Sequence, residues 1–207
     1  MKKPCNLPVF VMTFALLAVI GVRVDTAEAV SCPPDLEGRT VPSNVEVRSG
    51  TCNITRTTVK SNVKVQGGVA NITDSDIGGN IDSDGGTVRL HGGVTVKGNL
   101  SIDRAEQDGG FLGDDNEIRG NVQYSNGSGS FTAHYGTVGG NLKIEQHTGG
   151  ASIVGNSIGG NLECSGNRLQ PTGFGNKVSG NVTDQCASFE KGKFGKSIEV
   201  HDDGTPR

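Results

Sequence analysis

The dipeptide Gly-Asn recurs along this chain at an almost constant spacing, and this repeat limits the possible folds more than any other feature. Ser-Asn takes its place in the first two copies. The asparagines of the eight copies are Asn44, Asn62, Asn80, Asn99, Asn121, Asn141, Asn161 and Asn181. They are separated by 18, 18, 19, 22, 20, 20 and 20 residues. A regular period of this length is typical of a solenoid, in which each repeat buries its apolar side chains against its neighbours.

Alignment of the eight copies on the asparagine shows two columns of aliphatic residues. The column three residues before the asparagine consists of Val41, Val59, Ile77, Val96, Ile118, Val138, Ile158 and Val178. The column one residue after it consists of Val45, Val63, Ile81, Leu100, Val122, Leu142, Leu162 and Val182. The position three residues after it is apolar in six of the eight copies. The first and third positions after the asparagine share one face of a β-strand, because side chains alternate along a strand.

These patterns predict an all-β fold, a right-handed parallel β-helix (solenoid) of about eight turns that is capped at both ends. Each turn of about 20 residues is expected to hold three short strands, each paired with its equivalent one turn away. Glycine is expected at the corner because it tolerates positive φ. The asparagines are expected to be structural, with hydrogen bonds between neighbours along the axis. A helical fold would need apolar spacings of three and four over at least ten residues, and the chain after its leader has no such stretch.

The composition agrees with a narrow core. Glycine accounts for 33 of the 207 residues and tryptophan is absent, whereas the usual share of glycine is roughly 7%. A chain with so few aromatic residues cannot fill a thick core, but it can fill layers that each bury a few aliphatic side chains. Low-complexity disorder is the alternative interpretation of the glycine content, and the regular order of the apolar positions argues against it.

Residues 1–29 are predicted to be a secretory signal peptide. Two lysines precede an uncharged apolar run over residues 7–22, and Ala27-Glu28-Ala29 fits the small-x-small pattern of a cleavage site. Retention as a membrane anchor is the alternative, but the run is shorter than the roughly 20 residues that span a bilayer. A lipoprotein attached through Cys32 is a further alternative, with only a marginal lipobox. The expected protein is secreted, periplasmic or at the cell surface, with no stable membrane span after cleavage.

The remaining chain divides into two parts. Residues 30–186 are predicted to form the β-helix domain, and residues 187–207 a C-terminal cap and tail. After removal of the leader the chain carries 16 basic and 20 acidic residues, a net charge of −4. This balance excludes nucleic acid as an expected partner, because a basic surplus is needed to hold a polyanion.

Four cysteines follow the leader, one pair near each end of the repeat. Cys32 and Cys52 are 20 residues apart, and Cys164 and Cys186 are 22 apart. Because these separations are close to one turn, each pair is expected in adjacent layers, and export would place them where disulfides persist. We predict the disulfides Cys32–Cys52 and Cys164–Cys186, a choice among three connectivities that rests on the repeat. A metal site is the alternative, which neither a Cys-x-x-Cys motif nor clustered histidines support.

Residues 160–186 carry the pattern Gly-Asn-Leu-x-Cys, followed by Pro-Thr-Gly-x-Gly-Asn-x-Val-x-Gly-Asn and then Gln-Cys. Here the chain resembles a family of small secreted bacterial Gly-Asn repeat proteins that has no characterised activity. The resemblance implies a bacterial source and a disulfide at this end. The recurring Val-x-Gly-Asn is also similar to bactofilins, which are cytoskeletal β-helix polymers. The signal peptide and paired cysteines depart from bactofilins and put cytoplasmic filaments in doubt.

The longest interval between asparagines contains an acidic insertion over residues 103–117. The candidates for catalysis are Asp103, Glu106, Asp114 and Asp115. Polysaccharide-cleaving β-helices use carboxylates on one face as acid and base or to hold calcium. A small polysaccharide lyase or hydrolase is therefore the alternative function, and it requires two carboxylates about 5–10 Å apart. The competing interpretation is a solvated loop.

A second acidic group is a candidate for binding calcium, the one cofactor considered. It consists of Asp74, Asp76, Asp82 and Asp84. The segment resembles glycine-aspartate calcium repeats, although its spacing differs and it occurs once.

The expected function is that of a secreted or cell-surface β-helical structural or binding protein without catalytic activity. The repeat accounts for most of the chain, and the four histidines fall at unrelated repeat positions. The expected partners are cell-envelope polysaccharide, a host surface or other copies of the chain.

Overall fold

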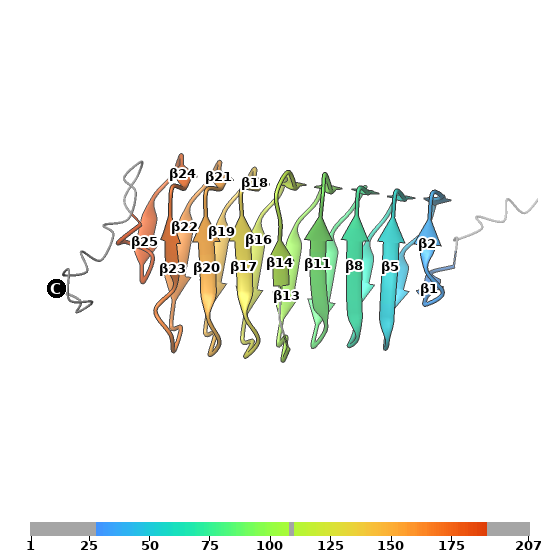
Figure 1. Ribbon diagram of the computed structural model, residues 1–207, viewed down its shortest axis with the longest axis horizontal. Helices are drawn as coiled ribbons and strands as arrows, with labels where there is room; N and C mark the ends of the chain where they lie inside the picture. The colour runs from blue at the N-terminus through green and yellow to red at the C-terminus, as the bar shows by residue number, and fades with distance from the viewer. Residues whose placement is uncertain (1–27, 108–109, 190–207) are drawn as a thin grey trace, which may run out of the picture.

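The computed structural model is a straight rod of stacked turns (Figure 1). It describes residues 28–107 and 110–189, with only the backbone described at 110 and 111. The predicted signal peptide, except for its last two residues, and the tail beyond Phe189 lie outside these ranges. Within them, no helix is long and apolar enough to cross a membrane.

Three parallel sheets form the sides of the rod, which we name A, B and C. The strands of sheet A are β1 (Val30–Cys32), β4 (Val45–Val47), β7 (Val63–Val65), β10 (Ile81–Asp84), β13 (Leu100–Asp103), β16 (Val122–Ser125), β19 (Leu142–Glu145), β22 (Leu162–Ser165) and β25 (Val182–Asp184). The strands of sheet B are β2 (Leu36–Glu37), β5 (Thr51–Thr55), β8 (Val69–Thr73), β11 (Thr87–His91), β14 (Gly110–Leu112), β17 (Phe131–His134), β20 (Ala151–Val154) and β23 (Thr172–Phe174). The strands of sheet C are β3 (Thr40–Val41), β6 (Thr58–Val59), β9 (Asp76–Ile77), β12 (Thr95–Val96), β15 (Glu117–Ile118), β18 (Thr137–Val138), β21 (Ser157–Ile158) and β24 (Lys177–Val178).

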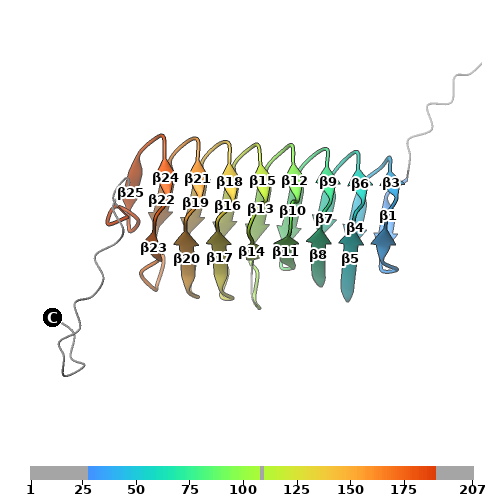
Figure 2. The same ribbon diagram turned by 45° about the horizontal axis from the view of Figure 1, so that its top comes forward.

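Each turn passes through sheets A, B and C in that order, and each strand pairs in parallel with its equivalent in the next turn (Figure 2). Val122 in β16, for example, pairs with Leu142 in β19. The chain completes eight such turns, and β25 begins a ninth. The predicted all-β parallel β-helix of eight turns is therefore confirmed.

The two predicted aliphatic columns line the core from sheets C and A. All residues of the column on sheet C are buried, and in the column on sheet A only Val182, in the last strand, is partly exposed. Sheet B supplies the third apolar side. The largest buried side chains are Tyr124 and Phe131, which stack with their ring centroids 4.8 Å apart.

The glycine of the Gly-Asn corner has a different physical cause from the one predicted. Its φ lies outside the left-handed region in every copy. A Cβ at Gly140 would instead overlap Oδ1 of Asn121 in the preceding turn, so close approach accounts for the glycine at this position. Left-handed backbone occurs at the other two corners, for example at Asn126 between sheets A and B (φ 56°) and at Tyr135 between sheets B and C (φ 53°).

A disulfide joins the first two layers of the rod, and another joins the last two. Cys32 in β1 is bonded to Cys52 in β5, with their Cα atoms 5.5 Å apart. Cys164 in β22 is bonded to Cys186, which follows β25, with a Cα separation of 5.2 Å. These are the two predicted disulfides.

A short turn after the second disulfide covers the C-terminal end of sheet B. It brings the ring of Phe189 against Gly173 in β23, where an added Cβ would lie 2.9 Å from Phe189 Cε2. Phe189 is buried as a result.

Candidate functional site

Asp103, the first carboxylate of the acidic insertion, ends β13 and is held by structural hydrogen bonds. Its Oδ1 accepts from Ser125 Oγ at 2.9 Å and from Asn126 Nδ2 at 2.7 Å. Arg104 Nη1 lies 3.3 Å from its other oxygen. Partial burial raises the pKa of Asp103, but these hydrogen bonds and the Arg104 charge outweigh it and lower the pKa below its ordinary value. A carboxyl kept ionised in this way is poorly suited to act as a general acid near neutral pH.

The other three candidates for catalysis do not all lie on the same side of sheet B as Asp103. Glu106 is exposed and lies in the same corner, between sheets A and B. Asp114 and Asp115 form an exposed turn at the corner between sheets B and C, beyond β14. The four carboxylates are thus divided between the two corners that flank sheet B.

The arginines nearest to these carboxylates form ion pairs along the surface of the rod. Arg104 pairs with Asp84 of the preceding turn as well as with Asp103. Arg119 Nε lies 3.2 Å from Glu117 Oε1, two residues away on the same side. The Arg104–Asp84 and Arg119–Glu117 pairs are exposed, so each contributes little to stability.

The four candidates for calcium lie on two different sides of the rod. Asp74 is at the corner between sheets B and C (φ 47°), and Asp76 begins β9 in sheet C. Asp82 and Asp84 point outward from β10 in sheet A. Throughout residues 28–107 and 110–189, no group of three or more His, Cys, Asp or Glu side chains is placed to hold a metal ion.

The asparagines of the Gly-Asn corner form a continuous ladder along the rod, which we call the corner ladder. The backbone N–H of each asparagine donates to Oδ1 of the asparagine one turn earlier, over 2.7–3.1 Å. Side-chain amides add bonds at only two steps, from Asn62 to Asn44 and from Asn121 to Asn99. The ladder therefore depends mainly on the side-chain carbonyl, which accepts a backbone N–H at a corner that is partly exposed in the first turns and exposed in the later ones.

A second ladder, which sequence reasoning missed, is buried at the corner between sheets B and C. This inner ladder contains Asn116, Asn156 and Asn176. Asn156 Oδ1 accepts the N–H of Gly136 at 3.0 Å, and its Nδ2 donates to the carbonyl of Ala133 at 2.7 Å. Both polar atoms of the side chain therefore satisfy backbone groups that water cannot reach.

The signal for the inner ladder was present in the same alignment. The residues five positions before the corner asparagine are Arg39, Thr57, Ser75, Val94, Asn116, Gly136, Asn156 and Asn176. Five of the eight are buried and polar. In the earlier turns Ser75 performs the same role, because its Oγ accepts the N–H of Thr57 at 3.0 Å and donates to the carbonyl of Thr73 at 2.7 Å.

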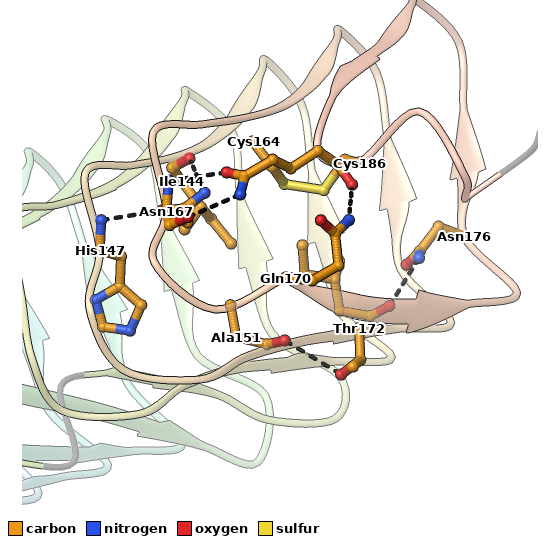
Figure 3. The surroundings of a disulfide bond; sticks show 11 residues. Ile144, His147, Ala151, Cys164, Asn167, Gln170, Thr172, Asn176 and Cys186 are labelled. Atoms are coloured by element: carbon orange, nitrogen blue, oxygen red, sulfur yellow. Dashed lines mark hydrogen bonds between the residues drawn. A yellow bond between two sulfur atoms is a disulfide. The ribbon is translucent and has the colours of Figure 1, made fainter.

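The C-terminal disulfide lies beside a similar buried position at the corner between sheets A and B (Figure 3). Asn167 Oδ1 accepts the N–H of His147, and Asn167 Nδ2 donates to the carbonyl of Ile144, both at 3.0 Å. The imidazole of His147 is buried against Tyr124, with ring centroids 4.6 Å apart. Among the described residues, neither of its ring nitrogens has a hydrogen-bond partner. Burial lowers the pKa of His147.

The outer face of sheet B is charged in its first turns. Arg56 pairs with Glu37 across one turn. Asp35 accepts from both the backbone N–H and the side-chain amide of Asn53, each at 2.9 Å. Asn71 Nδ2 donates to Asn53 Oδ1 at 2.9 Å and extends this line of hydrogen bonds into the next turn.

The same face changes character in turns six to eight, where we call it the uncharged face. It consists of the outward side chains of β17, β20 and β23 and one corner residue: Thr132, His134, Tyr135, Ser152, Val154, Thr172 and Phe174. Residues 126–142, 146–162 and 169–176 contain no Asp, Glu, Lys or Arg. Tyr135 is 59% exposed and Phe174 is 47% exposed, a high exposure for large apolar side chains. This face is the strongest candidate for contact with a partner, because exposed aromatic side chains are enriched at interfaces.

In comparisons with known proteins, no family model matches the chain, and no curated protein or solved structure shows significant similarity to it.

Proposed function

We propose that this chain is exported and acts as a non-catalytic binding rod at the surface of a bacterial cell. The observation that carries the proposal is the repetition of outward side chains in register on each side of the rod. On sheet A, for example, Glu46, Lys64 and Asp82 follow one another in neighbouring strands, about 4.8 Å apart along the axis. A surface that repeats at a fixed step is suited to a polymer that also repeats, such as cell-envelope polysaccharide.

Export is supported by both ends of the domain. Two disulfides link neighbouring layers, and such bonds persist in oxidising compartments outside the cytoplasm. The charged, apolar and small-residue segments of the first 29 residues form the expected order of a secretory leader.

A binding role fits the acidic insertion better than catalysis does. Asp103 is engaged by Ser125, Asn126 and Arg104, and Asp114 and Asp115 lie at the other edge of sheet B. Inverting and retaining glycosidases instead place an acid and a second carboxylate about 5–10 Å apart across the bond that they cleave.

Expression of the full chain with its leader in a bacterium tests the proposal. We expect the mature protein in the periplasm or medium with its cysteines unavailable to alkylation. We also expect it to sediment with isolated cell-envelope polysaccharide without releasing reducing ends or unsaturated sugars. Retention in the cytoplasm with free thiols would contradict export. Product release that is lost in Asp103→Asn or Asp114→Asn would establish the lyase or hydrolase alternative.

A further inference from the structure

We propose that the uncharged face binds an extended, uncharged polysaccharide, with sugar rings stacked on Tyr135 and Phe174. This inference rests on the proposed function and deepens it, because it assigns the side of the rod and the chemical class of the polymer. Four features of the face support it: the placement of its rings, the row of hydroxyl groups beside them, the absence of charge and the step between layers.

The ring of Tyr135 is held in place by a glycine in the next turn. An ideal Cβ on Gly155 would lie 2.5 Å from Cδ1 and Cε1 of Tyr135, so the ring covers the position where a side chain would be. Gly155 has φ 68°, a left-handed conformation that glycine adopts without strain. Tyr135 therefore belongs to turn six, but its ring lies over turn seven.

Phe174 continues the apolar surface by one more layer. In the strand register Val154 lies between His134 and Phe174. Val154 points outward yet is only 9% exposed. Tyr135 and Phe174 thus belong to layers two steps apart, about 9.6 Å along the axis, and the Tyr135 ring covers part of the layer between them. This distance is close to the length of two sugar units in an extended β-linked chain.

Hydroxyl groups flank the rings. Thr132 in β17 pairs directly with Ser152 in β20, and both side chains point outward. His134 Nε2 lies 3.0 Å from Ser152 Oγ. A sugar ring presents C–H groups on its faces and hydroxyl groups at its edge, so it needs an aromatic surface with donors and acceptors beside it.

The charge distribution selects an uncharged polymer. A uronate or phosphate polymer would meet no Lys or Arg on this face and would be desolvated without a partner charge. Charged side chains are instead concentrated elsewhere, as in the Glu37–Arg56 pair of the early turns of sheet B and the Lys143–Glu145 pair of sheet A, where the Nζ to Oε2 distance is 2.8 Å. The neutral face thus complements a neutral ligand.

The test uses the exported, disulfide-bonded full protein and a panel of cellulose, chitin and β-1,3-glucan in sedimentation and affinity electrophoresis. We expect binding to at least one of these polymers, weakened about tenfold or more in Tyr135→Ala and in Phe174→Ala by loss of the stacking surface. The matched control is Leu169→Ala, because Leu169 is 50% exposed but lies at the corner between sheets A and B. Binding is expected to be unchanged in this control and between about 0.05 and 0.5 M salt.

A second variant separates the placement of the ring from its presence. Gly155→Ala keeps both aromatic residues but displaces the Tyr135 ring, and we expect it to weaken binding while the circular dichroism of the β-sheet is retained. If this variant unfolds, Tyr135→Ala and Phe174→Ala still decide the question, because both side chains are exposed.

Several outcomes would overturn the inference. One is equal binding by wild type, Tyr135→Ala and Phe174→Ala, and another is binding only to charged polymers that is lost at high salt. A dimer that forms with concentration and disappears in Phe174→Ala would make the face a self-association surface. If the variants still sediment with envelope material, the assigned face is wrong while the proposed function stands. If wild type itself binds no envelope material, the proposed function fails.

Discussion

Polar side chains recur at two corners of this rod with the same period, continuously in the corner ladder and in five of eight turns at the position of the inner ladder, and the two corners differ in their access to water. In the corner ladder, Asn161 Oδ1 accepts the backbone N–H of Asn181 at 2.8 Å on the exposed edge of the rod. In the inner ladder, Asn156 accepts from Gly136 and donates to Ala133 in the interior. Both residues are asparagines, but the side chain of Asn161 binds one backbone group of a neighbouring turn whereas that of Asn156 binds two.

The difference shows that asparagine is used for two separate physical reasons. At the corner, water can replace the side chain if it is lost, so each residue contributes modestly. In the interior, a lost side chain leaves the N–H that it accepts without a partner and takes a donor from a buried carbonyl, and an unpaired buried group costs about 1–3 kcal/mol. Burial, rather than repetition, therefore decides which ladder stabilises the fold.

The largest expected effect comes from a change that keeps the carbonyl oxygen but removes the amide N–H. In Asn156→Asp the buried side chain no longer donates to Ala133 and brings a carboxyl into the interior, so we expect a loss of about 4 kcal/mol in the free energy of unfolding. In the matched variant Asn141→Asp the oxygen that accepts the N–H of Asn161 is preserved, and a loss below about 1 kcal/mol is expected. Urea denaturation measures both. Equal losses would show that burial does not distinguish the ladders.

Complete removal of the same side chain is expected to have a somewhat smaller effect. Asn156→Ala leaves the N–H of Gly136 without its acceptor and takes one donor from the carbonyl of Ala133, but it introduces no charge. We expect a loss of about 3 kcal/mol by denaturant titration. A loss below about 1 kcal/mol would mean that water enters the corner and replaces the amide.

His147 extends the comparison to a buried corner position without a satisfied side chain. Its folded pKa is lowered by burial, against the smaller opposite effect of the backbone groups of Gly150, Gly127 and Gly129. Above its ordinary value of 6.5 the imidazole is neutral in both states. As the pH falls below that value the unfolded chain binds a proton that the folded chain does not, so stability falls toward the folded pKa.

The measurement is the free energy of unfolding of wild type and His147→Phe at pH 7 and pH 5. We expect the wild type to lose more stability than the variant over this interval. Tyr124, the titratable side chain stacked against the imidazole, has a pKa raised by burial to about 12 and stays neutral throughout. The same pH dependence in both proteins would assign the effect to other groups.

The smallest expected effect belongs to the exposed ladder. Asn161→Ala removes one acceptor from the N–H of Asn181, which water can then satisfy, and a loss of about 1 kcal/mol is expected by thermal or urea unfolding. A loss as large as that of Asn156→Ala would indicate that the corner ladder is coupled along the rod, so that breaking one step weakens several.

The fold could be predicted from the sequence because its core is formed by aliphatic residues at fixed distances from each corner asparagine. Val138 and Leu142, three residues before and one residue after an asparagine, occupy the core from sheets C and A in the predicted way. The cysteine pairs followed from the same period. The cause of the corner glycine could not be predicted, because it is contact with Asn121 of another turn rather than a local φ preference.

The candidate surfaces were harder to predict, because they depend on which outward side chains of different turns become neighbours. The grouping of Asp103 with Asp114 was suggested by proximity in sequence, but a strand of sheet B lies between them. Tyr135 and Phe174 are 39 residues apart in the sequence, and the register of β17, β20 and β23 brings their layers together. If the eight repeats had also been aligned at their outward-facing positions, the alignment would have shown that this face carries no charged residue in turns six to eight.

The position of the two disulfides has a consequence for how the rod comes apart. In a solenoid each layer contacts only its neighbours, so a terminal layer has one partner and is the first to peel away. Here each terminal layer is covalently tied to the layer behind it. Fraying from an end must therefore dislodge two layers together, and the oxidised rod is expected to resist proteases that trim frayed ends, whereas the reduced rod would unravel one turn at a time.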